Sequence, residues 1–391
     1  MAIVILAATR TPLGAFQGAL ASVPAPRLGA VAIRGAVEQA KISPADVTDV
    51  LMGNVLQAGL GQAPARQAAI HAGLPSATRC VTVHKVCGSG LQAVMQGAHS
   101  LAAGDSSLVV AGGMENMSAA PYLLPKARDG FRLGHQQVID SLIHDGLWDP
   151  YNNLHMGHCA EQCAKKYSLT REQQDAYAAE SFRRANAAQN DGRFAQEITP
   201  VEFADAKNKL TRVEHDESPA RANYEKIPLL RPAFDPAGTI TAANASTIND
   251  GAAALVLATV ESARTKNLKP LARIVAFGAH AQDPVWFTTA PVSAAQNALK
   301  RAGWGIDEVD LWEVNEAFAV VPLAFMRELG VSHRKLNVRG GAISLGHPIG
   351  ASGARILVTL LAALRERGAR RGVAAVCIGG GEGLAVCVEL L

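Results

Sequence analysis

Two cysteines and one histidine, far apart in the chain, could together perform one kind of chemistry. Cys87, His347 and Cys377 each have a glycine within two residues. A thiol becomes a nucleophile when a base takes its proton, and an imidazole can be that base. The neighbouring glycines allow a substrate to approach the backbone closely. These residue types predict an acyl-transfer site with a nucleophile, an activator and a second acid/base.

The position of Cys87 between two expected elements strengthens this interpretation. The apolar run 81–86 predicts a strand, and 91–103 predicts a helix closed by Gly104. A thiol at a helix N-terminus is favoured as the thiolate by the backbone dipole. The alternative is a buried structural cysteine, and for His347 a loop histidine bonded to a carbonyl. The local patterns alone leave these alternatives open.

The elements that must position these residues alternate along most of the chain. Short apolar runs alternate with longer segments of helical periodicity, which indicates a mixed sheet covered by helices on both faces. We expect strands at 3–8, 47–55, 81–86, 108–111, 252–258, 272–279, 310–314, 336–339, 373–378 and 384–390. We expect helices at 26–41, 61–73, 91–103, 171–190, 293–302, 316–330 and 352–367.

The middle of the chain departs from this alternation, and the two ends repeat it. Residues 121–249 are more polar, although Thr170 and Gln173 form a capping box before a strong helix. This region is expected to be an insertion that lies over another part of the protein. The order of strand, glycine-rich bend and long helix occurs at both 81–103 and 336–367, and a strand ending in glycines follows each. The repetition suggests an internal duplication.

Composition limits the classes of protein to which the chain could belong. The 391 residues are 49% apolar and only 5% aromatic, which fits two or three domains with aliphatic cores. A net charge of +3 without a long block of like charges predicts no nucleic-acid arm. No apolar run approaches the ~18 residues that a membrane span needs. The six cysteines include no Cys-x-x-Cys pair, which favours reduced thiols, a cytoplasmic location and no metal site at Cys159 and Cys163.

Three longer motifs then point to one family. Asn315 opens Asn-Glu-Ala-Phe, His347 lies in a run that extends to Gly353, and Cys377 opens Cys-Ile-Gly-Gly-Gly. With Cys87, these motifs resemble those of the thiolases, and the resemblance extends from Arg10 to the last residues. It implies two halves, each a five-stranded mixed sheet, in a layered α/β/α/β/α arrangement. The expected domains are 1–120 with 250–268, an inserted loop domain at 121–249, and 269–391.

The resemblance also implies a reaction and the roles of individual residues. The expected activity is that of an acetyl-CoA C-acetyltransferase, which condenses two acetyl-CoA reversibly to acetoacetyl-CoA and CoA. Cys87 would carry the acetyl group, His347 would activate it, and Cys377 would be the second acid/base. The N–H groups of Cys87 and Gly379 would form one oxyanion hole, and Asn315 would hold a water for another, although Asn315 also suits a helix N-cap. No permanent cofactor is expected, with CoA as substrate and product.

The same resemblance assigns residues to substrate binding. His155-Met156-Gly157 marks relatives that act on short 3-ketoacyl-CoA, and 242–251 resembles the pantetheine-binding run. The expected substrate and CoA contacts are His155, Met156, Arg221, Ala242, Ser246, Phe287, Ala317 and Phe318. The chain departs from the family pattern at Thr247, where glycine is common, at His84, where asparagine is usual, and at Trp286-Phe287, where residues are often smaller.

Several alternatives differ in activity. A degradative 3-ketoacyl-CoA thiolase of fatty-acid β-oxidation would use the same residues on longer chains. A decarboxylating ketoacyl synthase typically needs a second histidine where Cys377 stands. A non-catalytic acyl-CoA-binding protein would not need all four reactive groups, and the first strand opens no Gly-x-Gly-x-x-Gly dinucleotide motif. Residues 123–134 resemble a tetramerisation loop, so we expect a homotetramer, a dimer of dimers.

Overall fold

The chain folds into two halves with the same strand order. The computed structural model describes residues 2–204 and 208–391. The first half orders its strands β4-β3-β5-β12-β1, and the second orders them β14-β15-β16-β13. In the first half, β3 pairs parallel with both β4 and β5, and β12 pairs antiparallel with both β5 and β1. In the second half, β14 and β15 are parallel, and β16 is antiparallel to both β15 and β13. The strands are β1 (Ile3–Arg10), β3 (Asp49–Gly53), β4 (Arg79–Val83), β5 (Leu108–Asn116), β12 (Asn249–Thr259), β13 (Ala272–Ala281), β14 (Leu311–Val314), β15 (Arg371–Ile378) and β16 (Glu382–Leu390).

The two half-sheets are joined into one sheet, and one strand predicted in the second half does not form. Strands β1 and β13 pair antiparallel over three residues, so that the halves share one sheet. The short strand β2 (Gly14–Ala15) pairs with β12 beside this path and makes the tenth strand. The strand predicted at 336–339 was wrong, because only isolated bridges form there, one of them between Leu336 and Trp312. Asn337 adopts a left-handed conformation with φ of 48°, which ends the extended backbone, and its side chain accepts a hydrogen bond from Val314 N at 2.8 Å.

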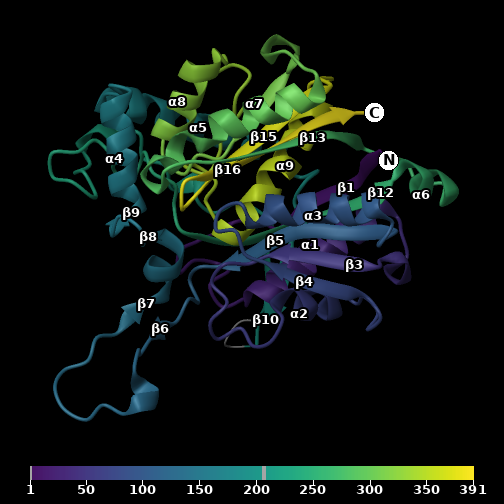
Figure 1. Ribbon diagram of the computed structural model, residues 1–391, viewed down its shortest axis with the longest axis horizontal. Helices are drawn as coiled ribbons and strands as arrows, with labels where there is room; N and C mark the ends of the chain where they lie inside the picture. Colours follow the sequence, from purple (N-terminus) through teal and green to yellow (C-terminus); the bar gives the residue numbers. More distant parts are fainter. Residues whose placement is uncertain (1, 205–207) are drawn as a thin grey trace.

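Helices fill the space between the half-sheets and cover their outer faces (Figure 1). Helices α3 (Ser89–Ala103) and α9 (Ile349–Glu366) form the middle layer and pack into one apolar core with both halves. Helices α1 (Ala25–Ala40) and α2 (Pro64–His71) cover one outer face, and α7 (Ala290–Ala302) and α8 (Val320–Leu329) cover the other. The predicted layers and the duplicated plan are thereby confirmed, although the sheet of the second half has four strands instead of the five expected.

The two middle helices approach each other through glycines. A Cβ atom on Gly353 would lie 2.6 Å from Leu91 N, and one on Gly90 would lie 2.8 Å from Ala354 N. Real Cβ atoms do not come so close to backbone, so these positions need glycine. The close packing brings together the N-termini of α3 and α9, which follow Cys87 and His347 respectively.

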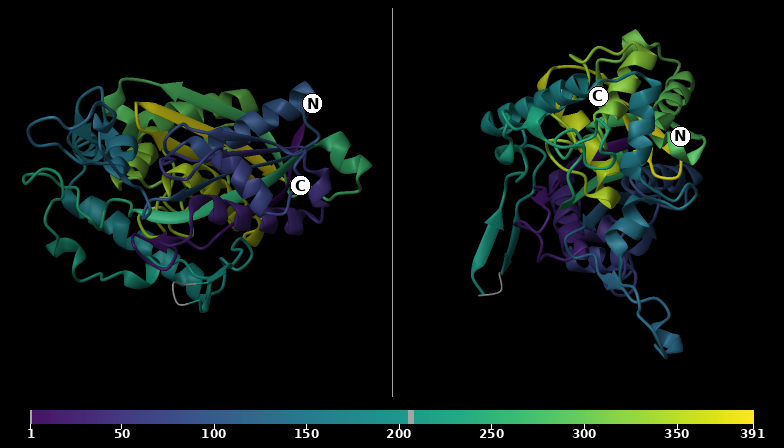
Figure 2. Two further views of the ribbon diagram at one scale, coloured as in Figure 1. Left: turned by 90° about the horizontal axis from the view of Figure 1, so that it is seen from below. Right: turned by 90° about the vertical axis from the view of Figure 1, so that its left-hand side faces the viewer.

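The polar middle of the chain lies outside the sheet. Strands β5 and β12 are neighbours, with Asn116 opposite Asp250, and the chain between them leaves the sheet to form α4 (Met156–Lys166) and α5 (Arg171–Asn190). Helix α5 begins at the predicted capping box of Thr170 and Gln173. An arm that contains β6 (Tyr122–Leu123) and β7 (Ile139–Asp140) projects from the body (Figure 2). The boundaries of the inserted domain remain a prediction.

The remaining elements are short. The strands are β2 (Gly14–Ala15), β8 (Trp148–Asp149), β9 (Leu154–His155), β10 (Val201–Ala204) and β11 (Leu210–Val213), and α6 spans Val260–Thr265. Short 3-10 helices occur at Pro44–Asp46, Ala127–Asp129, Pro219–Arg221, Ile227–Leu229, Pro284–Thr289 and Ile306–Glu308, and a π-helix spans Leu142–Leu147. Within the two described ranges, no helix is both long enough and apolar enough to cross a membrane.

Candidate active site

Cys87 sits on a tight turn that enters helix α3. Val86 has a φ of 44°, which is rare and strained for a β-branched residue. Ser89 holds the turn, since its hydroxyl accepts from Lys85 N at 2.8 Å and donates to Val86 O at 2.7 Å. The turn is closed by Gly88 N, which donates to Lys85 O at 3.0 Å. The backbone conformation therefore fixes where the thiol is presented.

His347 faces this thiol in a defined tautomer. Its Nε2 lies 3.3 Å from Cys87 Sγ, and its Nδ1 lies 2.6 Å from Ser352 Oγ. The Ser352 hydroxyl donates to Pro348 O at 2.9 Å, so its oxygen is left to accept the proton of Nδ1. Nε2 then carries no proton and can accept one from Cys87. The fold therefore places the Cys87 thiol beside an unprotonated nitrogen of His347, which can act as its base.

Burial keeps both members of this pair neutral in the free protein. Desolvation raises the pKa of Cys87 to about 11, although hydrogen bonds from the backbone N–H groups of Gly379 and Cys87 oppose the rise. Desolvation, with a smaller contribution from Arg355, lowers the pKa of His347 to about 3. The resting pair is a thiol and a neutral imidazole, so the proton must move during the attack rather than before it.

Cys377 and Asn315 come from neighbouring parallel strands that end at the site. Asn315 follows β14, and its N–H donates to Ala375 O of β15 at 2.9 Å. Its Nδ2 lies 3.5 Å from His347 Nδ1, and its buried Oδ1 has no partner within the described residues. Desolvation, and then electrostatic repulsion between the negatively charged forms of Cys377 and nearby Cys87, raises the pKa of Cys377 well above its ordinary value. These four side chains therefore converge.

The structure corrects the expectation that Asn315 caps a helix. The predicted helix 316–330 begins only at Val320, with Ala319 at its N-cap. The intervening Glu316 is buried and accepts hydrogen bonds from Tyr177 Oη at 2.8 Å and Ser181 Oγ at 2.7 Å. This tertiary network holds the segment out of the helix and leaves the Asn315 side chain at the site.

An apolar cavity of about 290 Å³ opens onto the thiol. Nine of the predicted site residues line it: Cys87, His155, Met156, Ser246, Phe287, Ala317, Phe318, His347 and Gly379. The others that line it are Val86, Met117, Gly146, Leu147, Phe234, Ala245, Thr247, Ile248 and Ile349. Such a lining favours an apolar or thioether-like segment of a ligand over a charged one.

Aromatic side chains form one wall of the cavity. Phe318 packs edge-to-face on Phe234 and Phe287, with ring centroids 6.2 and 6.4 Å apart. Phe234 also stacks on His155 at 4.7 Å, and Gly157 permits this because a Cβ there would lie 2.3 Å from the Phe234 ring. The His155 Nδ1 caps α4 by accepting from Gly157 N at 3.1 Å. The wall is thus rigid, and His155 has a structural role in it.

The predicted pantetheine-binding run borders the cavity through its backbone. Ser246 N donates to Ala317 O at 2.9 Å, and His347 N donates to Thr247 O at 3.2 Å. The Thr247 hydroxyl, which replaces the common glycine, donates to Asn249 Oδ1 at 2.7 Å. The extra side chain is therefore held by a partner, and its backbone helps to position His347.

Two predicted substrate contacts lie elsewhere. Arg221 is exposed and pairs with the Glu217 carboxylate, which also accepts from Ala15 N at 2.9 Å. Ala242 is exposed and does not line the cavity. Cys377 and Asn315 also do not line it, because both side chains are buried behind its surface. The roles of Arg221 and Ala242 remain predictions.

Sequence reasoning missed Glu115, which is fully buried beside the site. Its carboxylate accepts hydrogen bonds from the N–H groups of Val55, Leu56 and Gly350 at 3.0, 3.2 and 2.9 Å. Burial raises its pKa to about 7. Glu115 therefore ties the first half to the start of α9. The only signal in the sequence was an acidic residue at the end of an otherwise apolar strand.

The described part of the chain contains no group of three or more His, Cys, Asp or Glu side chains placed to hold a metal ion. All six cysteines are free. The site is thus built from thiols, an imidazole, an amide and backbone N–H groups.

Comparison with known proteins gives the same family over both halves. The sequence matches "Thiolase, N-terminal domain" at residues 3–261 and "Thiolase, C-terminal domain" at residues 268–390. Acetyl-CoA acetyltransferases from Pseudomonas aeruginosa and Cupriavidus necator are each 51% identical, over 98% and 99% of both chains respectively. The fold is similar to the Acat5 thiolase of Ascaris suum in complex with coenzyme A (TM-score 0.95, 44% identity, both chains fully covered). It is also similar to the Bacillus anthracis acetyl-CoA acetyltransferase (TM-score 0.97, 40% identity, 100% and 99% covered).

Proposed function

The chain belongs to the thiolase family, and on this premise we propose that it is an acetyl-CoA C-acetyltransferase. It condenses two acetyl-CoA reversibly to acetoacetyl-CoA and CoA. The observation that carries the proposal is the 3.3 Å contact between Cys87 Sγ and an unprotonated His347 Nε2 at the apolar cavity. This is the arrangement of an activated nucleophile.

The first half-reaction transfers an acetyl group to Cys87. Its sulfur attacks the thioester carbonyl while its proton passes to His347 Nε2. The N–H groups of Cys87 and Gly379 stabilise the oxyanion, in keeping with their hydrogen bonds to the Cys87 sulfur. The C–S bond to CoA breaks, and the CoA thiolate takes the proton of Cys377, which is left as a thiolate while His347 keeps the proton from Cys87. The acetyl group remains on Cys87 as a thioester.

The second half-reaction forms the carbon–carbon bond. Cys377 removes the α-proton of a second acetyl-CoA, and the enolate oxygen is stabilised by His347 and a water on Asn315. The partnerless Oδ1 of Asn315 supports this role, since a buried acceptor needs a donor. The carbanion attacks the acetyl carbon, the bond to Cys87 sulfur breaks, and the proton held by His347 restores the Cys87 thiol. Cys377 keeps the α-proton and is again a thiol.

The aromatic wall supports a short acyl chain. Phe287 and Phe318 are buried and pack against each other, and the cavity they border measures only about 290 Å³. A degradative 3-ketoacyl-CoA thiolase would need more room for its longer substrates. The large side chain of Phe287, at a position that departs from the family pattern, therefore favours the short-chain activity.

The decisive experiment measures CoA-dependent cleavage of acetoacetyl-, 3-ketohexanoyl- and 3-ketodecanoyl-CoA, with Cys87→Ser as control. We expect rapid cleavage of the shortest substrate, lost in the variant. A preference for the longer substrates would assign the protein to the degradative branch. Binding of CoA without cleavage of any substrate would leave a binding protein and refute the proposal.

We also propose a homotetramer, a dimer of dimers, in a reducing compartment such as the cytoplasm. The arm around β6 and β7 exposes apolar side chains, with Leu133 96% exposed, which is costly unless another copy covers them (Figure 2). Six free cysteines suit a reducing compartment. Light scattering that gave a monomer would contradict the assembly.

A further inference from the structure

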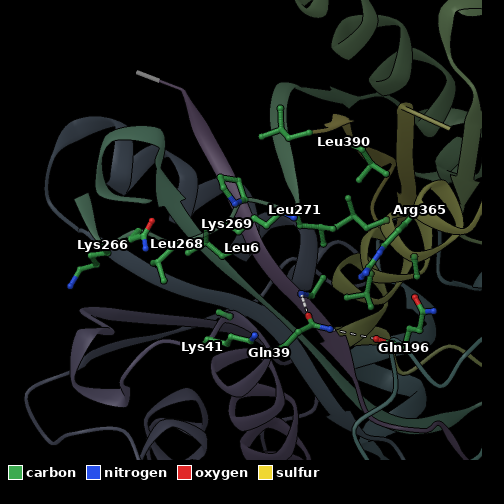
Figure 3. Close-up of a pocket in the computed structure, with 18 residues that line it drawn as sticks. Leu6, Gln39, Lys41, Gln196, Lys266, Leu268, Lys269, Leu271, Arg365 and Leu390 are labelled. Atoms are coloured by element: carbon green, nitrogen blue, oxygen red, sulfur yellow. Dashed lines mark hydrogen bonds between the residues drawn. The ribbon is translucent and has the colours of Figure 1, made fainter. Parts of the chain in front are cut away.

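A second cavity, of about 690 Å³, lies where the ends of several elements of the two halves meet (Figure 3). Residues at the end of α1, in the linker 266–271, at the end of α9 and at the end of β16 line it. Gln39 and Lys41 lie on one side of the cavity, and Arg365 lies on the other. Its volume is in the range of sites that bind small molecules.

This cavity is remote from the thiol. Helix α9 begins just after His347 and has 18 residues, so its last turn lies about 25 Å from its first. Arg365 belongs to that last turn. No residue lines both cavities. A ligand here would therefore not compete directly with a substrate at Cys87.

The floor of the cavity is apolar. Leu6, Val358 and Leu361 are buried, and Leu271 and Leu390 are half-buried beside them. The amide side chain of Gln39 is already engaged, since it accepts from Ala8 N at 2.8 Å and donates to Gln196 O at 3.5 Å. The floor thus offers contact to a hydrocarbon rather than to a polar body.

The rim of the cavity is cationic. Lys41, Lys269 and Arg365 line it, and none forms an ion pair within residues 2–204 and 208–391. The fourth cation, Lys266, points away and pairs with Asp46. None of the described residues that line the cavity has a carboxylate side chain.

We infer that this cavity binds a small amphipathic anion, whose phosphate or carboxylate head is attracted to the cationic rim of Lys41, Lys269 and Arg365 and whose apolar body packs on the leucine floor. The unpaired cations supply the attraction for the head, and burial of the body on Leu6, Leu271 and Leu390 adds the hydrophobic contribution. The inference is independent of the reaction at Cys87.

Titration calorimetry of the intact protein, with CoA present at saturation to fill the active site, would test whether this cavity binds an amphipathic anion. The ligands are octyl phosphate, octanoate, inorganic phosphate and octanol. We expect octyl phosphate or octanoate to bind more tightly than both phosphate and octanol, and the tighter of the two identifies the head group. Equal binding of all four, or binding that CoA abolishes, would overturn the inference.

Substitutions of lining residues, with a neighbouring residue as control, test whether the ligand binds in this cavity. Arg365→Gln and Lys269→Gln should each weaken the amphiphile by about fivefold, as expected for an exposed ion pair. Arg367→Gln removes a cation at the same helix end that does not line the cavity, and it should leave binding unchanged. All three residues are exposed, and an unchanged thermal midpoint will show that folding is intact. Equal affinity in all variants would refute the site.

Discussion

The hydroxyl of Ser352 is expected to control the rate through the tautomer of His347. In Ser352→Ala, His347 Nδ1 loses its 2.6 Å acceptor, and its remaining neighbour there is Asn315 Nδ2, a donor at 3.5 Å. The imidazole would then favour a proton on Nε2, where it cannot accept one from Cys87. Removal of one partner from a buried polar group costs about 2 kcal/mol. We therefore expect kcat to fall about 30-fold.

The assay is steady-state thiolysis of acetoacetyl-CoA, together with the rate at which iodoacetamide alkylates Cys87. Both kcat and alkylation should fall in Ser352→Ala, with a smaller change in KM because Ser352 does not line the cavity. Ser344→Ala is the matched control, since this buried hydroxyl contacts Ser181 and Gly341 rather than His347. A folded Ser352→Ala variant with kcat within about twofold of the parent would refute the tautomer reasoning.

Three further outcomes are expected. Because the pKa of Cys87 is raised to about 11 and that of His347 is lowered to about 3, alkylation of Cys87 should accelerate steadily from pH 7 to 10, and a plateau below pH 8 would contradict a neutral pair. Phe287→Val should raise kcat/KM for 3-ketohexanoyl-CoA relative to acetoacetyl-CoA by about tenfold, and an unchanged ratio would remove Phe287 from the acyl pocket. Leu133→Asp should reduce a tetramer to dimers in light scattering, whereas an unchanged mass would exclude the arm from the interface.

Local sequence patterns predicted most of the fold because the elements bury continuous apolar runs. The fully buried strands β5 and β12 and the capped helix α5 lie where periodicity placed them. The two errors share a cause, which is that distant partners overruled local preference. Asn337 leaves the extended conformation to hydrogen-bond Val314, and Glu316 leaves the helix for Tyr177 and Ser181.

Sequence motifs predicted those site residues that stand in short, distinctive runs. Cys87, His347, Cys377 and Asn315 stand in distinctive runs, and the structure brings all four together. Glu115 and Phe234 lie in no motif, and Ser352 lies in the motif of His347 without a role predicted for it, since the roles of all three depend on what folds against them. The resemblance alone suggested that Arg221 contacts CoA, whereas the structure pairs it locally with Glu217, four residues before it.

The matching positions of Cys87 and His347 restrict how such a site could have originated. Each residue precedes the middle-layer helix of its own half, and the two helices pack together around their N-termini. A symmetric pair of identical half-sized ancestors would have presented two thiols or two imidazoles there, never one of each. One of each requires two halves that differ in sequence, so neither half of this chain is expected to retain activity as a self-associating fragment.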